Sequence, residues 1–349
     1  MKPLVAFHVV TWNGERYIPE LLDSLRTQTL APTTVRFVDN ASTDRTRSLL
    51  EAYGGGATMI RHIRNLGFAG GHNQAFRLFL DKLGEQDPTH VYVAVVNQDV
   101  ILTPTTLEKL VEAMEAHPHV GSVQPKLLRA YIEHAGDDVF AHTVCAERID
   151  STGIKATHGR EFFDRGAGAL DEGQFDEKRE IFGPTGACAL YRARALLDVR
   201  VDETVFDPTF FMYREDVDLA WRLQWAGWDS LFVPEAVAYH HRGLFAPASS
   251  GWLERIARRR AKHRRLAAYS TRNLFLSILK NESFLNMILA WPWILFMVLR
   301  QVLYSLFFEP WVCVELCLST RLLPHVVRMR RATFRSAKRR SSALRRLFR

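Results

Sequence analysis

Cysteine is scarce in this sequence and shows no pairing pattern. Four cysteines occur in 349 residues, at positions 145, 188, 313 and 317, and their spacing fits neither a disulfide framework nor a zinc site. This scarcity excludes the small disulfide-rich secreted folds and favours a reducing, cytoplasmic compartment. The apolar run near the N-terminus is too short for a secretory signal, so we interpret it as a first buried strand.

Two common phosphate-binding motifs are also missing. No GxxxxGK followed by Ser or Thr occurs, and the glycine-rich segment at residues 67–71 does not follow GxGxxG. Dinucleotide-binding and P-loop functions are therefore disfavoured. The apolar content of 47% and charged content of 24% are those of an ordinary globular protein, without an internal repeat or a long linker.

Acidic residues are absent from the C-terminal stretch. Residues 319–349 contain 11 Lys and Arg and no Asp or Glu, so the rest of the chain has a net charge of 8 − 11 = −3. A basic tail beside apolar sequence favours an anionic membrane surface over nucleic acid as its partner. The apolar segments 283–299 and 302–318 fall short of the about 20 residues that cross a bilayer. We expect helices in the membrane plane, with a spanning helix as the alternative.

The first hundred residues alternate between apolar runs and helical patterns. Runs typical of strands occupy residues 4–10, 35–38, 59–63 and 91–96, and each ends in a polar cluster. This alternation predicts an α/β fold with a doubly wound, mostly parallel sheet, whose ligands bind beyond the carboxyl ends of the strands. The pattern weakens over residues 122–173, where we expect loops and edge strands that shape a substrate pocket. Residues 252–265 are strongly basic and favour a helix.

Carboxylates follow two of the predicted strands. Asp39 and Asp44 come after the second, and Asp99 follows the fourth together with Asn97. A carboxylate at a strand end can accept from a nucleotide base or ribose hydroxyl, and beside a diphosphate it can hold Mg²⁺ or Mn²⁺. Asp39 and Asp44 can equally serve as turn and N-cap residues, which we favour for Asp44. For Asp99 we favour a functional role.

A glycine-rich loop and a histidine pair are further candidates. The loop at residues 67–71 precedes a helix and allows backbone N–H groups to approach a phosphate. His240 and His241 follow a late strand, where neighbouring side chains point to opposite sides. One of them can complete a metal site with Asp99, and the other is then structural.

An acidic cluster opens the helical pattern within residues 210–228. Glu215, Asp216 and Asp218 fall within four residues, and Gly227 ends the pattern as a C-cap. Acids in a first helical turn are favoured by the helix dipole, which is the structural explanation. The alternative is that one of them is the general base that the strand-end carboxylates lack.

These motifs together resemble glycosyltransferase family 2, and in particular its rhamnosyltransferase-like branch. The resemblance covers about residues 3–245 and rests on these segments, in this order: VVTWNG, FVDNASTD, RNLGFAGGHNQAF, VVNQDV, FGPTGACALYR, FDPTFFMYREDVDLAWRLQWAGW and PEAVAYHH. It implies a GT-A fold at residues 1–250, with a nucleotide-sugar half at 1–120 and an acceptor half at 121–250. Residues 251–349 would form a helical, basic, membrane-associating region.

The resemblance also implies roles for individual residues. Asp216 would be the catalytic base, and Glu215 and Asp218 would orient it, bind acceptor hydroxyls or cap the helix. Asp99 and His240 would hold Mg²⁺ or Mn²⁺, with Asn97 in place of the first acid of the family's Asp-x-Asp. The expected nucleotide-sugar contacts are Thr11, Asn13, Asp39, Asn65, Gly67, Gly70, Gly71, Asn73, Asn97 and Asp99.

The implied reaction is an inverting, metal-dependent sugar transfer. The expected donor is a dTDP-linked deoxysugar such as L-rhamnose, or a UDP-sugar, and the expected acceptor is a lipid-linked saccharide or lipopolysaccharide in cell-surface polysaccharide synthesis. The Gln-x-x-Arg-Trp signature of processive synthases is absent. A nucleotidyltransferase and a non-catalytic membrane-bound scaffold are the alternatives. The protein is expected at the inner face of the cell membrane, with no nucleic-acid partner.

Overall fold

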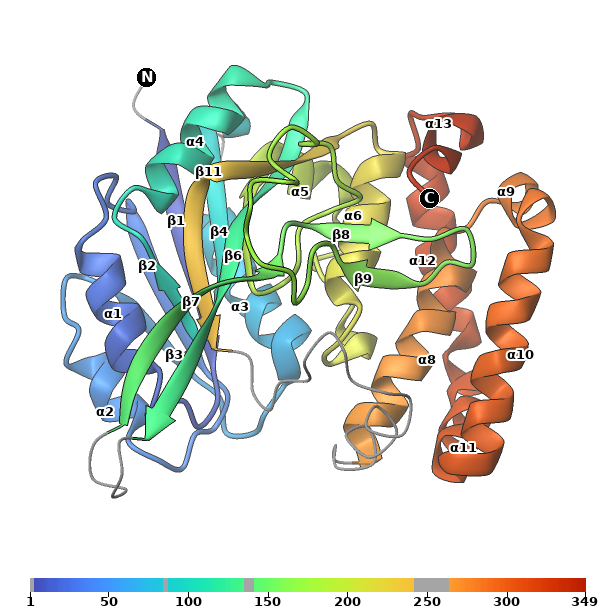
Figure 1. Cartoon of the computed structure of the whole chain (residues 1–349), viewed down its shortest axis with the longest axis horizontal. Coiled ribbons are helices and arrows are strands. Elements are labelled where there is room, and N and C mark those ends of the chain that lie inside the picture. The colour runs from blue at the N-terminus through green and yellow to red at the C-terminus, as the bar shows by residue number, and fades with distance from the viewer. Residues whose placement is uncertain (1–2, 84–86, 135–140, 242–263) are drawn as a thin grey trace.

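One mixed β-sheet forms the centre of the protein (Figure 1). The computed structural model describes residues 3–83, 87–134, 141–241 and 264–349. The sheet has nine strands in the order β3-β2-β1-β4-β10-β6-β11-β5, with β7 beside β6. The strands are β1 (Leu4–Thr11), β2 (Thr34–Asp39), β3 (Thr58–Arg61), β4 (Val91–Asn97), β5 (Val100–Leu102), β6 (Val120–His134), β7 (Ala141–Ser151), β10 (Cys188–Arg192) and β11 (Asp229–His241).

Strand pairing differs between the two halves of the sheet. The first four long strands pair in parallel, as the alternation of strands and helices predicts. β10 then runs antiparallel to both β4 and β6, while β11 is parallel to β6. Through β10 the second half of the chain joins the first in one sheet, so the carboxyl end of β4 lies beside the beginning of β10.

Helices cover both faces of the sheet because the central strands are apolar on both sides. Along β4, Tyr92 and Ala94 pack in one cluster with side chains of α1 (Ile18–Arg26), α2 (Thr46–Glu51) and α4 (Thr106–Ala116). Val93 and Val95 face the other way and pack with α3 (Gly67–Leu83), α5 (Ala193–Val199) and α6 (Glu215–Trp225). This double coverage confirms the predicted doubly wound arrangement.

The prediction of loops and edge strands for residues 122–173 is wrong for its first part. Residues 120–134 form β6, which pairs with β10, β11 and β7 inside the sheet. Buried polar side chains interrupt its apolar pattern, among them Gln124, which donates to Ser151, Lys126, which pairs with two aspartates, and Arg129, which lies near Asp150. Because these partners come from distant segments, the strand does not show in the local sequence.

The C-terminal helices stand together at one end of the molecule (Figure 1). They are α8 (Arg264–Asn281), α9 (Phe284–Leu289), α10 (Trp291–Phe308), α11 (Pro310–Leu318), α12 (Leu323–Arg335) and α13 (Ser341–Arg345). A small hairpin, β8 (Ile154–Ala156) and β9 (Phe162–Asp164), reaches from the sheet toward them. Among the described helices, α10 alone is long and apolar enough to cross a membrane. Most of the predicted basic helix at 252–265 lies outside the described residues.

The basic tail folds back onto the acidic helix. Phe348 is buried, and its ring centroid lies 5.4 Å from that of Trp221 in α6. Leu344 joins the same cluster, and the N–H of Lys338 donates to the carbonyl of Trp225. Gly227, with φ of 94°, ends α6 as predicted. The tail therefore contributes to the protein core as well as to the charged surface.

Candidate active site

The ends of β1 and β2 form the first part of the site. Asp39 is fully buried, and its carboxylate accepts from the N–H of Ser42 and, at 2.7 Å, from the Nε of Arg47. The hydroxyl of Thr11 lies 3.4 Å from the same carboxylate. Asn13 has a left-handed φ of 47°, and its side chain accepts from the loop after β2. These bonds hold the two strand-end loops against each other around one carboxylate.

Two other polar residues brace these loops. Asp44 accepts from the N–H groups of Glu15 and Thr46, both at 3.0 Å, so it is a turn residue; the predicted N-cap role is wrong, because the N-cap of α2 is Arg45. Gln98, just past β4, accepts from the N–H of Trp12 at 2.9 Å and donates back to its carbonyl at 3.2 Å. Gln98 thereby ties the end of β4 to the end of β1, a role that its sequence position alone does not reveal.

The glycine-rich segment is helical, and the predicted loop at residues 67–71 is wrong. α3 begins at Gly67, whose N–H donates to Asn65 Oδ1 at 2.7 Å. Gly67 has φ of 72°, and a Cβ at this residue would lie 2.2 Å from the carbonyl oxygen of Phe211. At Gly70 and Gly71 a Cβ would come within 2.7 and 2.8 Å of neighbouring side chains. Close packing of α3 therefore requires these glycines, and their contact with a donor phosphate stays a prediction.

Asn73 lies in the second turn of α3 and faces the protein interior. Its side-chain oxygen accepts from the N–H groups of Val205 and Phe206 at 3.0 and 2.9 Å, and its amide donates to the carbonyl of Phe206 at 2.7 Å. These three bonds fix the segment that leads to the acidic helix. They account for the burial of Asn73 without a nucleotide.

Asp99 and His240 meet at the carboxyl end of β4. His240 Nε2 lies 3.3 Å from Asp99 Oδ1, and His240 Nδ1 lies 2.9 Å from Asp150 Oδ2. Burial by itself would lower the pKa of His240, but the charges and hydrogen bonds of Asp99 and Asp150 outweigh it and raise this pKa to about 10. His241 points the other way and contacts Glu20 at 2.8 Å, as strand alternation predicts. Sequence reasoning missed Asp150.

The Asp99–His240 pair fits an incomplete divalent-metal site. No cluster of three or more potential ligands that could hold a metal occurs within the described ranges. One carboxylate and one imidazole are nevertheless suitable for Mn²⁺ or Mg²⁺, which commonly take their remaining ligands from substrate phosphates and water. Asp150 would orient His240 as outer-shell carboxylates orient metal-binding histidines. Metal binding would displace the proton that His240 otherwise carries.

α6 presents Asp216 at the same edge of the sheet. Asp216 Oδ2 accepts from the N–H of Gly186 at 3.0 Å, and Oδ1 accepts from the N–H of Val217 at 2.8 Å. Burial raises the pKa of Asp216 although these bonds and the nearby Arg214 favour its ionised form, and Asp164 adds a like charge. The result is a hydrogen-bonded carboxylate of raised basicity, as a general base requires.

The other two acids of α6 have different surroundings. Glu215 is buried, its Oε2 has no hydrogen-bond partner among the described residues, and burial followed by the charge of Asp216 raises its pKa to about 8. Asp218 is fully buried and lies 2.8 Å from Lys280 Nζ and 3.0 Å from Arg222 Nε. Burial opposes ionisation of Asp218, yet Lys280 and Arg222 lower its pKa. Asp218 thus anchors α6 to α8.

A strained segment leads into α6. Phe211, Tyr213 and Arg214 all have positive φ, at 61°, 70° and 71°. Consecutive non-glycine residues in this region are costly and cluster at functional sites. The strain turns Arg214 toward β9, where its guanidinium donates to the carbonyl of Phe162 at 2.8 Å. Sequence reasoning missed Arg214 and Asp164, because their proximity to Asp216 depends on this backbone path.

A two-residue turn connects Asp216 to the end of β4. Gly186 donates its N–H to Asp216, and the carbonyl of the next residue, Ala187, accepts from the N–H of Asn97 at 2.8 Å. Asn97 in turn stands two residues before Asp99. The turn that precedes β10 therefore brings the two candidate chemical groups to one edge of the sheet. The cavities described in this structure, of about 390 and 260 Å³, lie instead among the C-terminal helices.

Comparisons with known proteins bear on the family and the fold of the chain. The model of the family "Glycosyl transferase family 2" matches residues 7–200, more than half of the chain. An N-acetylglucosaminyl-diphospho-decaprenol L-rhamnosyltransferase of Mycobacterium tuberculosis is 29% identical over 245 residues, which are 69% of this chain and 76% of the relative.

Solved structures share the fold at low sequence identity. The mannosyltransferase PcManGT of Pyrobaculum calidifontis, in complex with GDP-Man and Mn²⁺, has a TM-score of 0.50 and 16% identity, covering 96% of this chain and 86% of its own. TarS 1-349 of S. aureus, in complex with UDP-GlcNAc, has a TM-score of 0.50 and 16% identity, covering 99% and 92%. These likenesses confirm the predicted GT-A fold.

Proposed function

The chain belongs to glycosyl transferase family 2, and on this premise we propose that it transfers a sugar with inversion to a lipid-linked saccharide acceptor. The proposed donor is a dTDP-linked deoxysugar such as L-rhamnose, with a UDP-sugar as the alternative. Two features support this proposal: the rhamnosyltransferase-like sequence, and the similarity to an enzyme whose name gives a diphospho-decaprenol acceptor. Family membership favours sugar transfer over nucleotidyl transfer and over a purely scaffolding role.

The observation that carries the proposal is the connection between Asp216 and the Asp99–His240 pair. The turn bonds to Asp216 through Gly186 and to Asn97, two residues before Asp99, through Ala187, which supports a base and a diphosphate-binding edge on the same side of the sheet. In an inverting transfer the acceptor oxygen attacks the anomeric carbon on the side opposite the leaving diphosphate. A base on one side and a cation-binding pair on the other is the arrangement that this reaction needs.

Asp216 is the proposed proton acceptor. Its carboxylate takes the proton of the acceptor hydroxyl while that oxygen bonds to the anomeric carbon, and the bond from this carbon to the diphosphate breaks. Glu215, whose pKa is raised to about 8, stays protonated near neutral pH and so does not compete as a second negative charge. The N–H of Gly186 fixes the orientation of the base.

The donor's diphosphate is proposed to lie beside Asp99 and His240. Mn²⁺ or Mg²⁺ held there would neutralise charge on the departing nucleoside diphosphate. We propose that Asp39, with Thr11 and Asn13 around it, binds the base or ribose. We propose that the first turn of α3 lies near the phosphates, where donor binding would compete with the bonds from the N–H groups of Gly67 and Ala69 to Asn65 and Phe211.

We further propose that the protein works at the inner membrane surface as a peripheral protein. Many large apolar side chains of α9 and α10 are exposed, including Phe284, Trp291, Trp293, Phe296 and Phe307. An exposed apolar surface of this extent marks an interaction site. A lipid-linked acceptor would then be presented beside the enzyme.

The deciding experiment is transfer from dTDP-L-rhamnose or UDP-GlcNAc to a polyprenyl-diphosphate GlcNAc, with and without Mn²⁺. D216N is expected to lose about 100- to 10,000-fold in turnover, the usual contribution of a general base, while donor affinity persists. The anomeric configuration of the product, read by NMR, tests inversion. The matched control D23N changes an exposed carboxylate of α1 and should transfer normally. Full turnover by D216N would refute the assignment of the base.

A further inference from the structure

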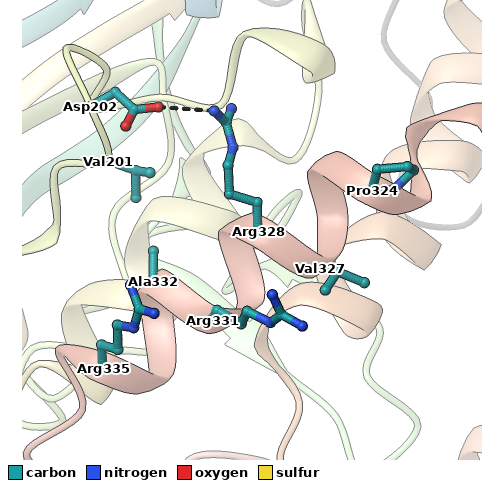
Figure 2. A pocket seen from close by; sticks show the side chains of 8 residues that line it. All are labelled: Val201, Asp202, Pro324, Val327, Arg328, Arg331, Ala332 and Arg335. Atoms are coloured by element: carbon teal, nitrogen blue, oxygen red, sulfur yellow. Dashed lines mark ion pairs between the residues drawn. The ribbon is translucent and has the colours of Figure 1, made fainter.

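The outward face of α12 carries a groove whose lining includes three arginines. Its volume is about 390 Å³, and it lies between α12 and the segment at residues 201–202 (Figure 2). The lining residues are Val201, Asp202, Pro324, Val327, Arg328, Arg331, Ala332 and Arg335. Spacings of three and four residues place the three arginines on one side of the helix.

The charge of this groove is unbalanced. Arg328 Nη1 lies 3.2 Å from Asp202 Oδ2, the single acid among the lining residues. Figure 2 shows Arg331 and Arg335 on successive turns below this pair, without a drawn ion pair. The side chains of Arg328 and Asp202 are 59% and 65% exposed, so their ion pair is screened and easily exchanged for another anion. Among the described lining residues, three guanidinium groups therefore stand against one carboxylate.

We propose that this groove binds the phosphate group of an anionic phospholipid at the membrane surface. Arginine presents its donors in a planar fork that matches phosphate oxygens. Val201 and Val327 add apolar walls, and the exposed Leu323 extends them at the start of α12. A nucleic acid would instead call for aromatic side chains on which bases stack, and the groove has none. The inference deepens the proposed function, because it names the surface that meets the membrane holding the acceptor.

A chain of polar contacts connects the groove to the acidic helix. Arg328 lies 3.1 Å from His325, whose other ring nitrogen lies 3.0 Å from Asp207. Lys280 joins Asp207, at 2.6 Å, to Asp218 of α6, at 2.8 Å. Since most of this network is buried, α12 and α6 are held in fixed relation. A lipid bound in the groove would therefore set the position of the base relative to the membrane.

Vesicle binding tests the inference without donor or acceptor. The full-length protein is sedimented with vesicles of phosphatidylcholine containing one-third phosphatidylglycerol. The variant R331Q/R335Q removes two charges from the groove, and each is worth a factor of several in binding, so partitioning should weaken roughly 30-fold. The matched control R345Q/R346Q removes two exposed charges of the same tail outside the groove and should stay within about three-fold of the wild type.

The outcomes separate this inference from the proposed function. Equal losses in both variants would mean that the tail binds lipid through its diffuse charge, and unchanged partitioning of R331Q/R335Q would mean that the groove does not touch the membrane. Either result overturns the inference, as does a groove-dependent affinity for single-stranded RNA with no vesicle binding. Transfer to a short-chain, water-soluble acceptor should be normal in R331Q/R335Q. If the wild-type protein showed no transfer to this acceptor, the result would count against the proposed function and not against lipid binding by the groove.

Discussion

Replacing Lys280 by methionine removes the central charge of a buried ion-pair network. The Nζ of Lys280 lies 2.6 Å from Asp207 and 2.8 Å from Asp218, and all three side chains are fully buried. Removing one partner of a buried ion pair costs about 3–5 kcal/mol, because the remaining charge loses its compensation. Arg222 still pairs with Asp218 in the variant, whereas Asp207 loses its lysine partner and keeps only the contact with His325.

The expected loss translates into a measurable change in melting temperature. At about 2.1 cal/mol/K per residue, 349 residues give an unfolding entropy of about 0.7 kcal/mol/K, so K280M should melt about 4–7 °C below the wild type. The matched control K109M breaks the pair between Lys109 and Glu112, whose side chains are 37% and 57% exposed. A pair this exposed contributes at most about 1 kcal/mol, which is about 1 °C.

The pH dependence provides the sharper test of the same variant. In the wild type, burial opposes ionisation of Asp207, but Lys280 and then His325 hold its pKa well below the usual value, so its contribution is present above pH 4 and is lost in stronger acid. In K280M, burial dominates and raises the pKa of the carboxylates. The free-energy cost of ionising these buried carboxylates then destabilises the folded variant as pH rises above about 4. The difference in melting temperature should be largest at pH 7 and shrink toward pH 4–5.

A difference that stays constant from pH 4.5 to 8, or one below 2 °C at pH 7, would refute this account of the network. Circular dichroism melts of the two variants and the wild type at each pH are sufficient. K109M should follow the wild type throughout, because its partner is already solvated.

Two further variants test the site and the tail. In D164N, Asp216 loses a neighbouring like charge, so its pKa falls and the acidic limb of kcat/KM should move to lower pH; a shift to higher pH would contradict the assigned electrostatics. F348A removes a buried ring and should cost about 3–5 kcal/mol in unfolding free energy by denaturant titration, whereas F307A, on a ring that is 76% exposed, should cost little. Equal stability of F348A and the wild type would mean that the tail does not dock as described.

The first half of the fold could be predicted because its signals are local. β4 is an uninterrupted apolar run that ends in polar residues, and this run gives both its central place in the sheet and the position of Asp99 at its end. Gly227 likewise marks the end of α6 in the sequence. Where the pattern within one segment determines its structure, the sequence alone is sufficient to predict that element.

The elements that were missed depend on contacts between distant segments. β6 could not be recognised in the sequence, because its buried Lys126 is neutralised by two aspartates that follow about fifty residues later. Asp150 contacts His240 from a different strand of the sheet, and Asp164, at the end of the β8–β9 hairpin, acts on Asp216 through its charge. Asp218 shows the converse case: it belongs to the recognised acidic cluster, yet its contacts are to Lys280 and Arg222 inside the protein. Residue type and spacing cannot tell such an anchor from a catalytic acid.

The contacts of α10 bear on the proposed association with a membrane. Arg300, near the middle of this helix, pairs with Glu161 of the β8–β9 turn, and Gln301 donates to Thr271 of α8 at 3.2 Å. Met297 is 1% exposed and packs in one cluster with Trp221. A helix that crossed the bilayer in this arrangement would bring Glu161 and the polar turn to mid-membrane, where a single charge costs about 2.5–3.5 kcal/mol or more. With α10 in the membrane plane, its polar contacts face the protein and its exposed apolar side chains face lipid, so both faces have suitable surroundings. The packing of α10 therefore favours an in-plane helix over a spanning one.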